Sequence, residues 1–195
     1  MIKGIIFDLD GTVVEVPYDW NQIKKDLETG EKPILSYLKS LKEPEKSAKW
    51  KVLEKYEQEA TSRAVLKEGI REFLDFLARR GIKKALVTNN SRQNVCYLLR
   101  KFNLKFDLVV SRESGLWKPS GDPFLSVLKK LKIKREEAGV VGDSHFDVKA
   151  AQEAGISKIF ILNKDKERFS SSEAEIFSTV GKLQRRIEKL ILKEK

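Results

Sequence analysis

The stretch KGIIFDLDGT, residues 3–12, decides how this sequence is interpreted. Its first half, Lys3–Phe7, is a short apolar run that indicates a strand, and the pentapeptide 8–12 follows it directly. Side chains alternate along an extended chain, so Asp8 and Asp10 are expected on the same side. In open α/β sheets the ligand crevice lies beyond the carboxyl ends of the strands. Two carboxylates there repel each other unless a cation or a proton relieves the charge, which favours a functional site over a solvated Asp-Gly turn.

Four further short apolar runs recur along the chain, each followed by a segment with helical periodicity. The five predicted strands are Lys3–Phe7, Lys84–Thr88, Asp107–Val110, Ala138–Val141 and Lys158–Leu162. Apolar residues between them recur at helical spacing, as in Ile70, Phe73, Leu74 and Leu77. Continuous apolar strands that alternate with amphipathic helices indicate a parallel sheet covered on both faces. The predicted fold class is therefore α/β, with a doubly wound parallel sheet.

Residues 15–66 interrupt this alternation. Three helical stripes follow one another without a strand pattern between them, and Gly30, Pro33 and Pro44 separate the stripes. We therefore predict a small all-helical insertion at 15–66, while residues 1–14 and 67–195 form the α/β core domain. Toward the C-terminus, residues 163–178 are predicted to be loop and Thr179–Leu192 a final amphipathic helix.

The composition limits the classes of function. A chain of 195 residues with 41% hydrophobic and 35% charged residues can form a packed core, which excludes a disordered or low-complexity protein. No apolar run approaches the roughly 18 residues that cross a bilayer, so we expect neither a membrane span nor a signal peptide. The lone Cys96 fits a reducing, cytoplasmic setting, and the single histidine, His145, excludes a site built on two imidazoles.

The net charge of +10 suggests an anionic partner. Residues 98–135 carry ten basic and three acidic groups, whereas residues 15–66 are neutral, with ten of each. A solvated surface rich in Lys and Glu, as in heat-adapted proteins, accounts for this better than nucleic-acid binding does. The same charge helps to capture small anionic substrates by long-range steering.

Polar residues also follow other predicted strands where those strands end. Thr88-Asn89-Asn90-Ser91 offers a hydroxyl and helix N-terminal amides to an anion, although Asn90 or Ser91 also suits an ordinary helix cap. Lys118 lies in a loop and, taken alone, resembles one more surface lysine.

The strand Ala138–Val141 ends in two more acids. Asp147 has capping-box spacing from Ser144, so capping of the next helix can explain it. Asp143 precedes that cap and has no such structural explanation, which makes it the stronger candidate for a functional carboxylate.

Together these segments resemble the motifs of the haloacid dehalogenase superfamily. The pattern is closest to its phosphoglycolate phosphatase-like branch, in which a helical C1-type cap follows the first strand. The four motifs occur in the family's order: Asp8-Leu9-Asp10-Gly11-Thr12, Thr88, Lys118-Pro119 and Gly142-Asp143-Ser144-His145-Phe146-Asp147. The resemblance covers residues 1 to about 162 and assigns the insertion 15–66 to the cap.

The resemblance implies a phosphatase that hydrolyses a small phosphorylated metabolite through an aspartyl-phosphate. Asp8 would be the nucleophile and Asp10 the general acid and base. The carboxylates of Asp8 and Asp143 and the backbone carbonyl of Asp10 would bind Mg²⁺.

The same resemblance assigns the groups around the phosphate. Lys118 would contact Asp8 and the transferring phosphoryl oxygens, and Thr88 and Asn89 would hold the remaining oxygens. Asp147 would orient Lys118 or the waters of the metal.

Some alternatives stay open at this point. The presence of Asp10 argues against a dehalogenase, because that branch attacks carbon and lacks this second aspartate. A phosphomutase of the β-phosphoglucomutase type shares every motif, and a basic protein that binds nucleic acid or protein without turnover is the less favoured third reading. His145 is interpreted as an exposed helix start, with a substrate-facing role as its alternative. The sequence fixes neither the physiological substrate nor the oligomeric state.

Overall fold

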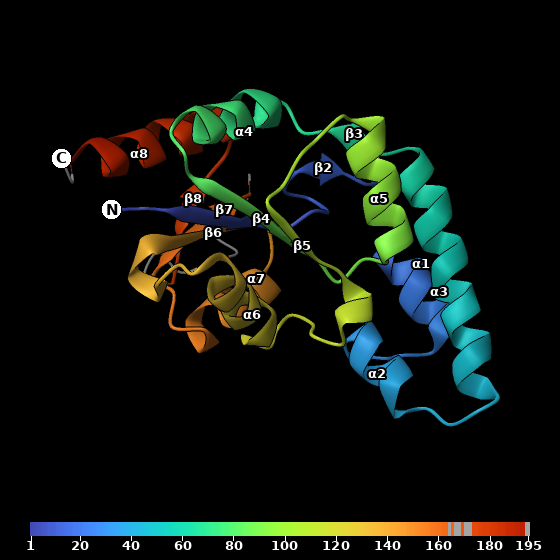
Figure 1. The fold of residues 1–195 in the computed structure, drawn as a ribbon. Helices are drawn as coiled ribbons and strands as arrows, with labels where there is room; N and C mark the ends of the chain where they lie inside the picture. Colours follow the sequence, from blue (N-terminus) through green and yellow to red (C-terminus); the bar gives the residue numbers. More distant parts are fainter. Residues whose placement is uncertain (164, 166–168, 170–172, 194–195) are drawn as a thin grey trace. The chain divides into compact units, whose positions relative to one another are not determined.

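The computed structural model describes residues 1–163, 165, 169 and 173–193. The chain forms two compact units, one of residues 1–15 and 66–195 and one of residues 16–65. The first unit is built on six parallel strands in the order β5-β4-β1-β6-β7-β8 (Figure 1). The strands are Gly4–Phe7 (β1), Lys83–Val87 (β4), Leu108–Val110 (β5), Ala138–Gly142 (β6), Lys158–Leu162 (β7) and Glu175–Phe177 (β8). The prediction of an α/β fold with a parallel sheet is confirmed.

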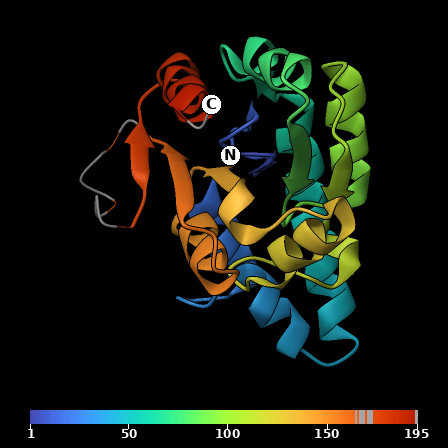
Figure 2. The same ribbon diagram turned by 60° about the vertical axis from the view of Figure 1, so that its left-hand side comes forward.

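Helices cover both faces of this sheet, as a doubly wound fold requires. They are Ile70–Arg79 (α4), Arg92–Lys101 (α5), Asp122–Leu131 (α6), His145–Glu153 (α7) and Val180–Lys193 (α8). On one face, α6 and α7 pack through a buried cluster that includes Ile6, Val127 and Val148. On the other, the ring of Phe7 meets that of Phe73 in α4 edge to face, with centroids 5.7 Å apart, and α8 contacts α4. Figures 1 and 2 show the two helix layers on opposite sides of the strands.

The alternation of side chains explains why β1 is apolar throughout. Ile6 faces one helix layer and Phe7 faces the other, so each residue of this strand meets a covered face. All four residues, Gly4–Phe7, are buried. A strand that is buried on both faces has no solvent-facing positions, and its sequence becomes a continuous apolar run.

β1 lies at the centre of the sheet, where the strand order reverses. It pairs with β4 on one side and β6 on the other, and Phe7 stands opposite both Leu86 and Val141. The pairing continues one residue further, since the Asp8 amide donates to the Val141 carbonyl at 2.9 Å. Ligand crevices in open α/β sheets form at such a reversal, beyond the carboxyl ends of the strands. The residues that follow β1, β4 and β6 therefore share one edge of the sheet.

The prediction of loop for residues 163–178 is wrong at its C-terminal end. Glu175–Phe177 forms β8, which pairs in parallel with β7, and the Asn163 amide donates to the Phe177 carbonyl at 3.0 Å. This strand begins with an exposed acid and has no buried residue, so it lacks the apolar run that marks the other strands. The other predicted loop residues 164, 166–168 and 170–172 lie outside the described part of the chain. The final helix, predicted at 179–192, is confirmed as α8.

The second unit, residues 16–65, is helical. Trp20–Leu27 (α1), Ile34–Ser40 (α2) and Glu45–Ser62 (α3) enclose a small core of Ile23, Leu27, Leu38 and Leu53. The three helices lie where the three stripes predict them. Two-residue strands, Val14–Glu15 (β2) and Val65–Leu66 (β3), pair where the chain leaves the first unit and returns to it, and they are too short to be expected from the sequence. None of the helices described has the length and apolar content that crossing a membrane requires.

Candidate active site

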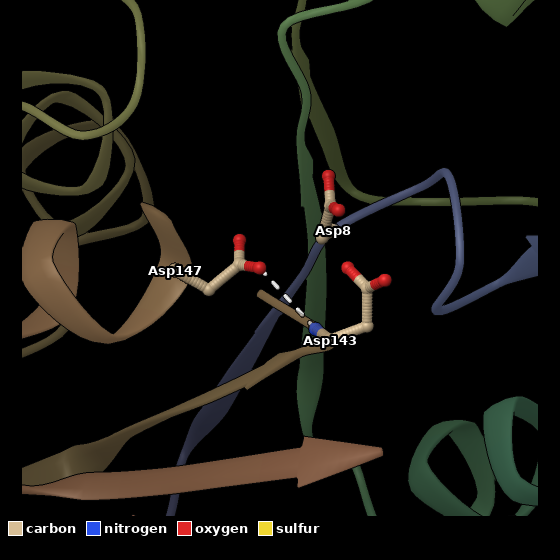
Figure 3. Close-up of side chains that lie close together, drawn as sticks. All are labelled: Asp8, Asp143 and Asp147. Carbon is tan, nitrogen blue, oxygen red and sulfur yellow. Dashed lines mark hydrogen bonds between the residues drawn. The ribbon is translucent and has the colours of Figure 1, made fainter. Parts of the chain in front are cut away.

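Three carboxylates lie together at this edge of the sheet (Figure 3). Asp8 follows β1, Asp143 follows β6, and Asp147 lies in the first turn of α7. One oxygen of each carboxylate lies within 4.8 Å of an oxygen of each of the others. Asp8 and Asp147 are buried, and Asp143 is partly exposed. Acids that are about 135 positions apart in the sequence thus lie close enough to bind the same small cation.

Lys118 lies beside these carboxylates. Its ammonium contacts an oxygen of Asp8 and an oxygen of Asp147, each at 2.6 Å, and only 4% of its side chain is exposed. Its backbone is held by Asn89, whose side-chain oxygen accepts from the Lys118 amide and whose side-chain nitrogen donates to the Lys118 carbonyl, both at 2.9 Å. The interpretation of Lys118 as a surface lysine is therefore excluded, because the loop that carries it is fixed to the end of β4.

Asp147 uses both of its oxygens within the protein. Oδ1 accepts from Lys118, while Oδ2 accepts from the amides of Asp143 and Ser144, at 3.2 and 3.1 Å, and from the Ser144 hydroxyl at 2.8 Å. It therefore caps α7 and also fixes the position of the lysine. This leaves Asp8 and Asp143 as the carboxylates better suited to bind a cation.

Two glycines allow this close packing. A Cβ atom at Gly11, whose φ is +82°, would lie 2.1 Å from an oxygen of Asp143. A Cβ atom at Gly142 would lie 2.3 Å from the carboxyl carbon of Asp147. Any other residue at either position would displace a carboxylate of the cluster.

The cluster holds more negative than positive charge, and the pKa values of its acids reflect this. Burial raises the pKa of Asp8 from 3.8 to about 8, against the lowering effect of Lys118 and together with repulsion from Asp147 and Asp143. Burial and repulsion from Asp147 raise the pKa of Asp143 to about 6. Burial opposes the charge of Lys118, but the two carboxylates it contacts outweigh that effect and raise its pKa. The ammonium stays charged, and the acids need a further cation or protons.

The donor set fits a hard divalent cation. Carboxylate oxygens are the ligands that Mg²⁺ prefers, and Asp8 and Asp143 present them from adjacent strand ends. Burial contributes most to the raised pKa values of both acids, and a dication would offset the repulsion between the carboxylates that raises these values further. The structure thus offers an oxygen-rich, electron-rich position in which Asp8 and Asp143 would hold the ion.

The free energy of unfolding of the metal-free protein should fall as the pH rises from about 5 to about 8.5. Asp8 and Asp143 have raised pKa values in the folded state, so the fold becomes less stable as they ionise. The loss is complete above about pH 6 for Asp143 and above about pH 8 for Asp8. Urea denaturation after treatment with EDTA measures the effect. Added Mg²⁺ should reduce it, and a stability that rises over this pH range would contradict the assignment.

The other predicted site residues lie close by. The Thr88 hydroxyl, which is buried, accepts from the Asn90 amide at 3.0 Å. The side chain of Asn89 holds the backbone of Lys118, so of its groups the backbone amide is the better candidate for a phosphoryl oxygen. Asp10 is not one of the three clustered acids, although its charge helps to raise the pKa of Asp143. Its two carboxylate oxygens accept from the side-chain nitrogen of Asn90 at 3.2 and 3.0 Å.

Sequence reasoning missed two residues at the site and left one undecided. The sequence predicts only a helix cap at Asn90. Lys67, which donates to the Gly11 carbonyl and whose charge lowers the pKa of Asp143, belongs to no motif. The alternation of side chains after β4 could have indicated that Asn89 and Asn90 point in different directions. His145 is exposed and its ring lies on that of Phe169, with centroids 4.4 Å apart.

Comparison with known proteins agrees with this geometry. A family model described as haloacid dehalogenase-like hydrolase matches residues 15–161. A protein of Caldanaerobacter subterraneus subsp. tengcongensis, provisionally named pyrophosphatase PpaX, is 32% identical over 186 residues, which cover 82% of this chain and 81% of that protein. The phosphoglycolate phosphatase of Nitrosospira multiformis is 31% identical over 189 residues, which cover 83% of each chain.

Solved structures show the same fold. The crystal structure of a predicted phosphoglycolate phosphatase from Haemophilus somnus matches with a TM-score of 0.76 at 23% identity, covering 95% of this chain and 98% of that one. The two proteins therefore share the parallel sheet and its helix layers. The residues that the family model matches include Lys118, Asp143 and Asp147. The chain belongs to the haloacid dehalogenase-like hydrolase family.

Proposed function

We propose that this protein is a Mg²⁺-dependent phosphatase that hydrolyses a small phosphomonoester, with Asp8 as the nucleophile. The observation that supports this most directly is the buried carboxylate of Asp8, which lies 2.6 Å from the ammonium of Lys118 and beside Asp143. Buried acids with raised pKa values destabilise a fold, and such groups gather at functional sites.

In the first step an oxygen of Asp8 attacks phosphorus, the bond from phosphorus to the leaving oxygen breaks, and an aspartyl-phosphate forms. Lys118 favours this approach of two anions, since an ammonium about 4 Å from an anionic oxygen contributes roughly 4 kcal/mol at an effective dielectric of about 20. Asp147 keeps the ammonium in place. Mg²⁺, when bound by Asp8, Asp143 and the Asp10 carbonyl, supplies further positive charge to the phosphoryl oxygens.

Asp10 moves the protons. It donates a proton to the leaving oxygen in the first step. In the second step it takes a proton from the water that attacks phosphorus, and the bond from phosphorus to the Asp8 oxygen breaks, which releases inorganic phosphate. Thr88 and the backbone amide of Asn89 bind the phosphoryl oxygens that Lys118 does not contact.

The substrate is a small phosphorylated metabolite. The names of the two relatives above, a phosphoglycolate phosphatase and a provisional pyrophosphatase, are both consistent with a small phosphorylated substrate. The helical unit 16–65 is the cap that the resemblance implies, and we expect its side chains to select the leaving group. The net charge of +10 attracts small anions of this kind.

Hydrolysis of p-nitrophenyl phosphate tests the proposal. We expect turnover in the presence of Mg²⁺, a loss of at least about 100-fold after treatment with EDTA, and recovery when Mg²⁺ is added back. Turnover that does not need a metal ion would contradict it. With hexose phosphates as substrates, release of free phosphate identifies a phosphatase, and an isomerised sugar phosphate would instead identify a phosphomutase.

A further inference from the structure

Two consecutive asparagines follow β4, and their side chains hold two different parts of the site. Asn89 bonds to the backbone of Lys118, as described above. Asn90 bonds to the carboxylate of Asp10, across 80 positions of the sequence. The residues after β4 thus provide one side chain that holds the backbone of Lys118 and one that contacts the carboxylate of Asp10.

The orientation of the Asn90 amide is fixed by its neighbours. Its side-chain oxygen accepts from the backbone amide of Ser91 at 2.7 Å and from the side-chain nitrogen of Asn94 at 3.0 Å. A backbone amide can only donate, so the oxygen must face Ser91 and the NH₂ group must face Asp10. Asn90 and Asn94 are 4% and 5% exposed, and burial leaves little room for another arrangement.

Capping of α5 does not explain this side chain. Ser91 is the cap residue, because its hydroxyl accepts from the Asn94 amide at 3.3 Å. The backbone of Asn90 is anchored separately, with its amide on the Thr88 hydroxyl and its carbonyl accepting from the Arg112 amide at 3.1 Å. The backbone at Asn90 and the cap of α5 are therefore held by other hydrogen bonds, and neither requires the bond from the Asn90 NH₂ group to Asp10.

We infer that Asn90 is a positioning residue for Asp10, which holds its carboxyl group in the orientation that protonates the leaving oxygen. The inference rests on the proposed role of Asp10 as the general acid. A protonated carboxyl group keeps one oxygen as an acceptor for Asn90 and turns its hydroxyl to the substrate. As the bond from phosphorus to the leaving oxygen breaks, the proton passes from Asp10 to that oxygen, and the Asp10 carboxylate keeps the hydrogen bond from Asn90. A carboxyl group that is already held in this orientation loses less conformational entropy on reaching the transition state than a freely rotating one would.

The dependence of kcat/KM on the leaving group tests this inference. The value of kcat/KM depends only on the steps up to release of the leaving alcohol, so the later role of Asp10 as a base does not affect it. Phenyl phosphate needs a proton on its leaving oxygen, whereas 2,4-dinitrophenyl phosphate loses a stable anion without one. For Asn90→Ala we expect kcat/KM to fall by about 100-fold on phenyl phosphate and by less than about threefold on 2,4-dinitrophenyl phosphate.

Matched variants separate positioning from structural damage. Both substrates are measured on one sample, so the ratio of the two kcat/KM values does not depend on the fraction of folded protein. Asn94→Ala, which loosens the Asn90 amide, should shift this ratio in the same direction by less. Asn89→Ala acts through Lys118 and should lower both rates alike, and Gln93→Ala, an exposed amide of the same helix, should change neither.

Each outcome decides between the two claims. Asp10→Asn should show the largest dependence on the leaving group, and it sets the scale. If Asp10→Asn shows this dependence but Asn90→Ala loses both activities equally, the inference about Asn90 is overturned and the proposed function stands. If the parent hydrolyses neither ester, or Asp10→Asn shows no dependence, the proposed function fails and the inference fails with it.

Discussion

Replacement of Asp8 by asparagine should lower the Mg²⁺-dependent hydrolysis of p-nitrophenyl phosphate by at least about 10⁴-fold. The amide has nearly the same shape and can still accept from Lys118, but its oxygen is a poor nucleophile and cannot form the acyl phosphate that the carboxylate forms. The measurement is kcat of the purified variant against the parent. A variant with the activity of the parent would remove Asp8 from the reaction and with it the proposed function.

The same variant should be more stable than the parent at about pH 8 without metal. Burial and neighbouring acids raise the pKa of Asp8 to about 8, so the carboxylate opposes folding when it is ionised. Removing this charge should increase the free energy of unfolding on the order of 2 kcal/mol in urea denaturation. Asp75→Asn, an exposed acid on α4, is the matched control and should change neither activity nor stability.

Replacement of Lys118 by methionine should have the opposite effect on stability. The chain of methionine fills similar space, but the carboxylates of Asp8 and Asp147 lose the ammonium that lies 2.6 Å from each. Removing one partner of a buried ion pair costs about 3–5 kcal/mol, and we expect a loss of this size in the metal-free protein at about pH 8. Activity should also be lost, because no charge then offsets the approach of Asp8 to the phosphate.

The pH dependence of this variant provides the check. At about pH 5 most Asp8 groups are protonated, so the destabilisation by Lys118→Met should be smaller there than at about pH 8. Lys130→Met, which removes an exposed lysine of α6, should leave both stability and activity unchanged. Equal stability of Lys118→Met and the parent at both pH values would contradict the ion-pair geometry described above.

Much of the fold could be predicted because each strand of a parallel sheet covered by helices appears in the sequence as a short apolar run. β1, β4, β5, β6 and β7 pair on both sides or lie under helices, and each leaves an apolar run of its own. β8 could not be found in this way, because Glu175–Phe177 begins with an exposed acid and has no buried residue, whereas β5, a strand of the same length, is apolar throughout.

The meeting of Asp8 and Asp143 could be anticipated for a related reason, whereas only the resemblance to the family implied that Lys118 lies beside them. Parallel strands end at one edge, so residues that follow different strands approach each other however far apart they are in the sequence. The bond from Asn90 to Asp10 could not be anticipated, because it depends on which way one buried amide points. That direction is set by Ser91 and Asn94, and the sequence pattern around them is that of an ordinary helix start.

The central place of β1 determines when the protein can become active during its synthesis. The ribosome delivers Gly4–Phe7 first, but β4 is made much later and β6, Ala138–Gly142, later still. Until β4 and β6 have both been synthesised, β1 is an apolar segment with two unpaired edges. Such segments are prone to aggregate, and pairing between strands far apart in the sequence is slow. A product that terminates before Ala138 lacks β6, β7, β8 and Asp143, so it can complete neither the parallel sheet nor the carboxylate cluster.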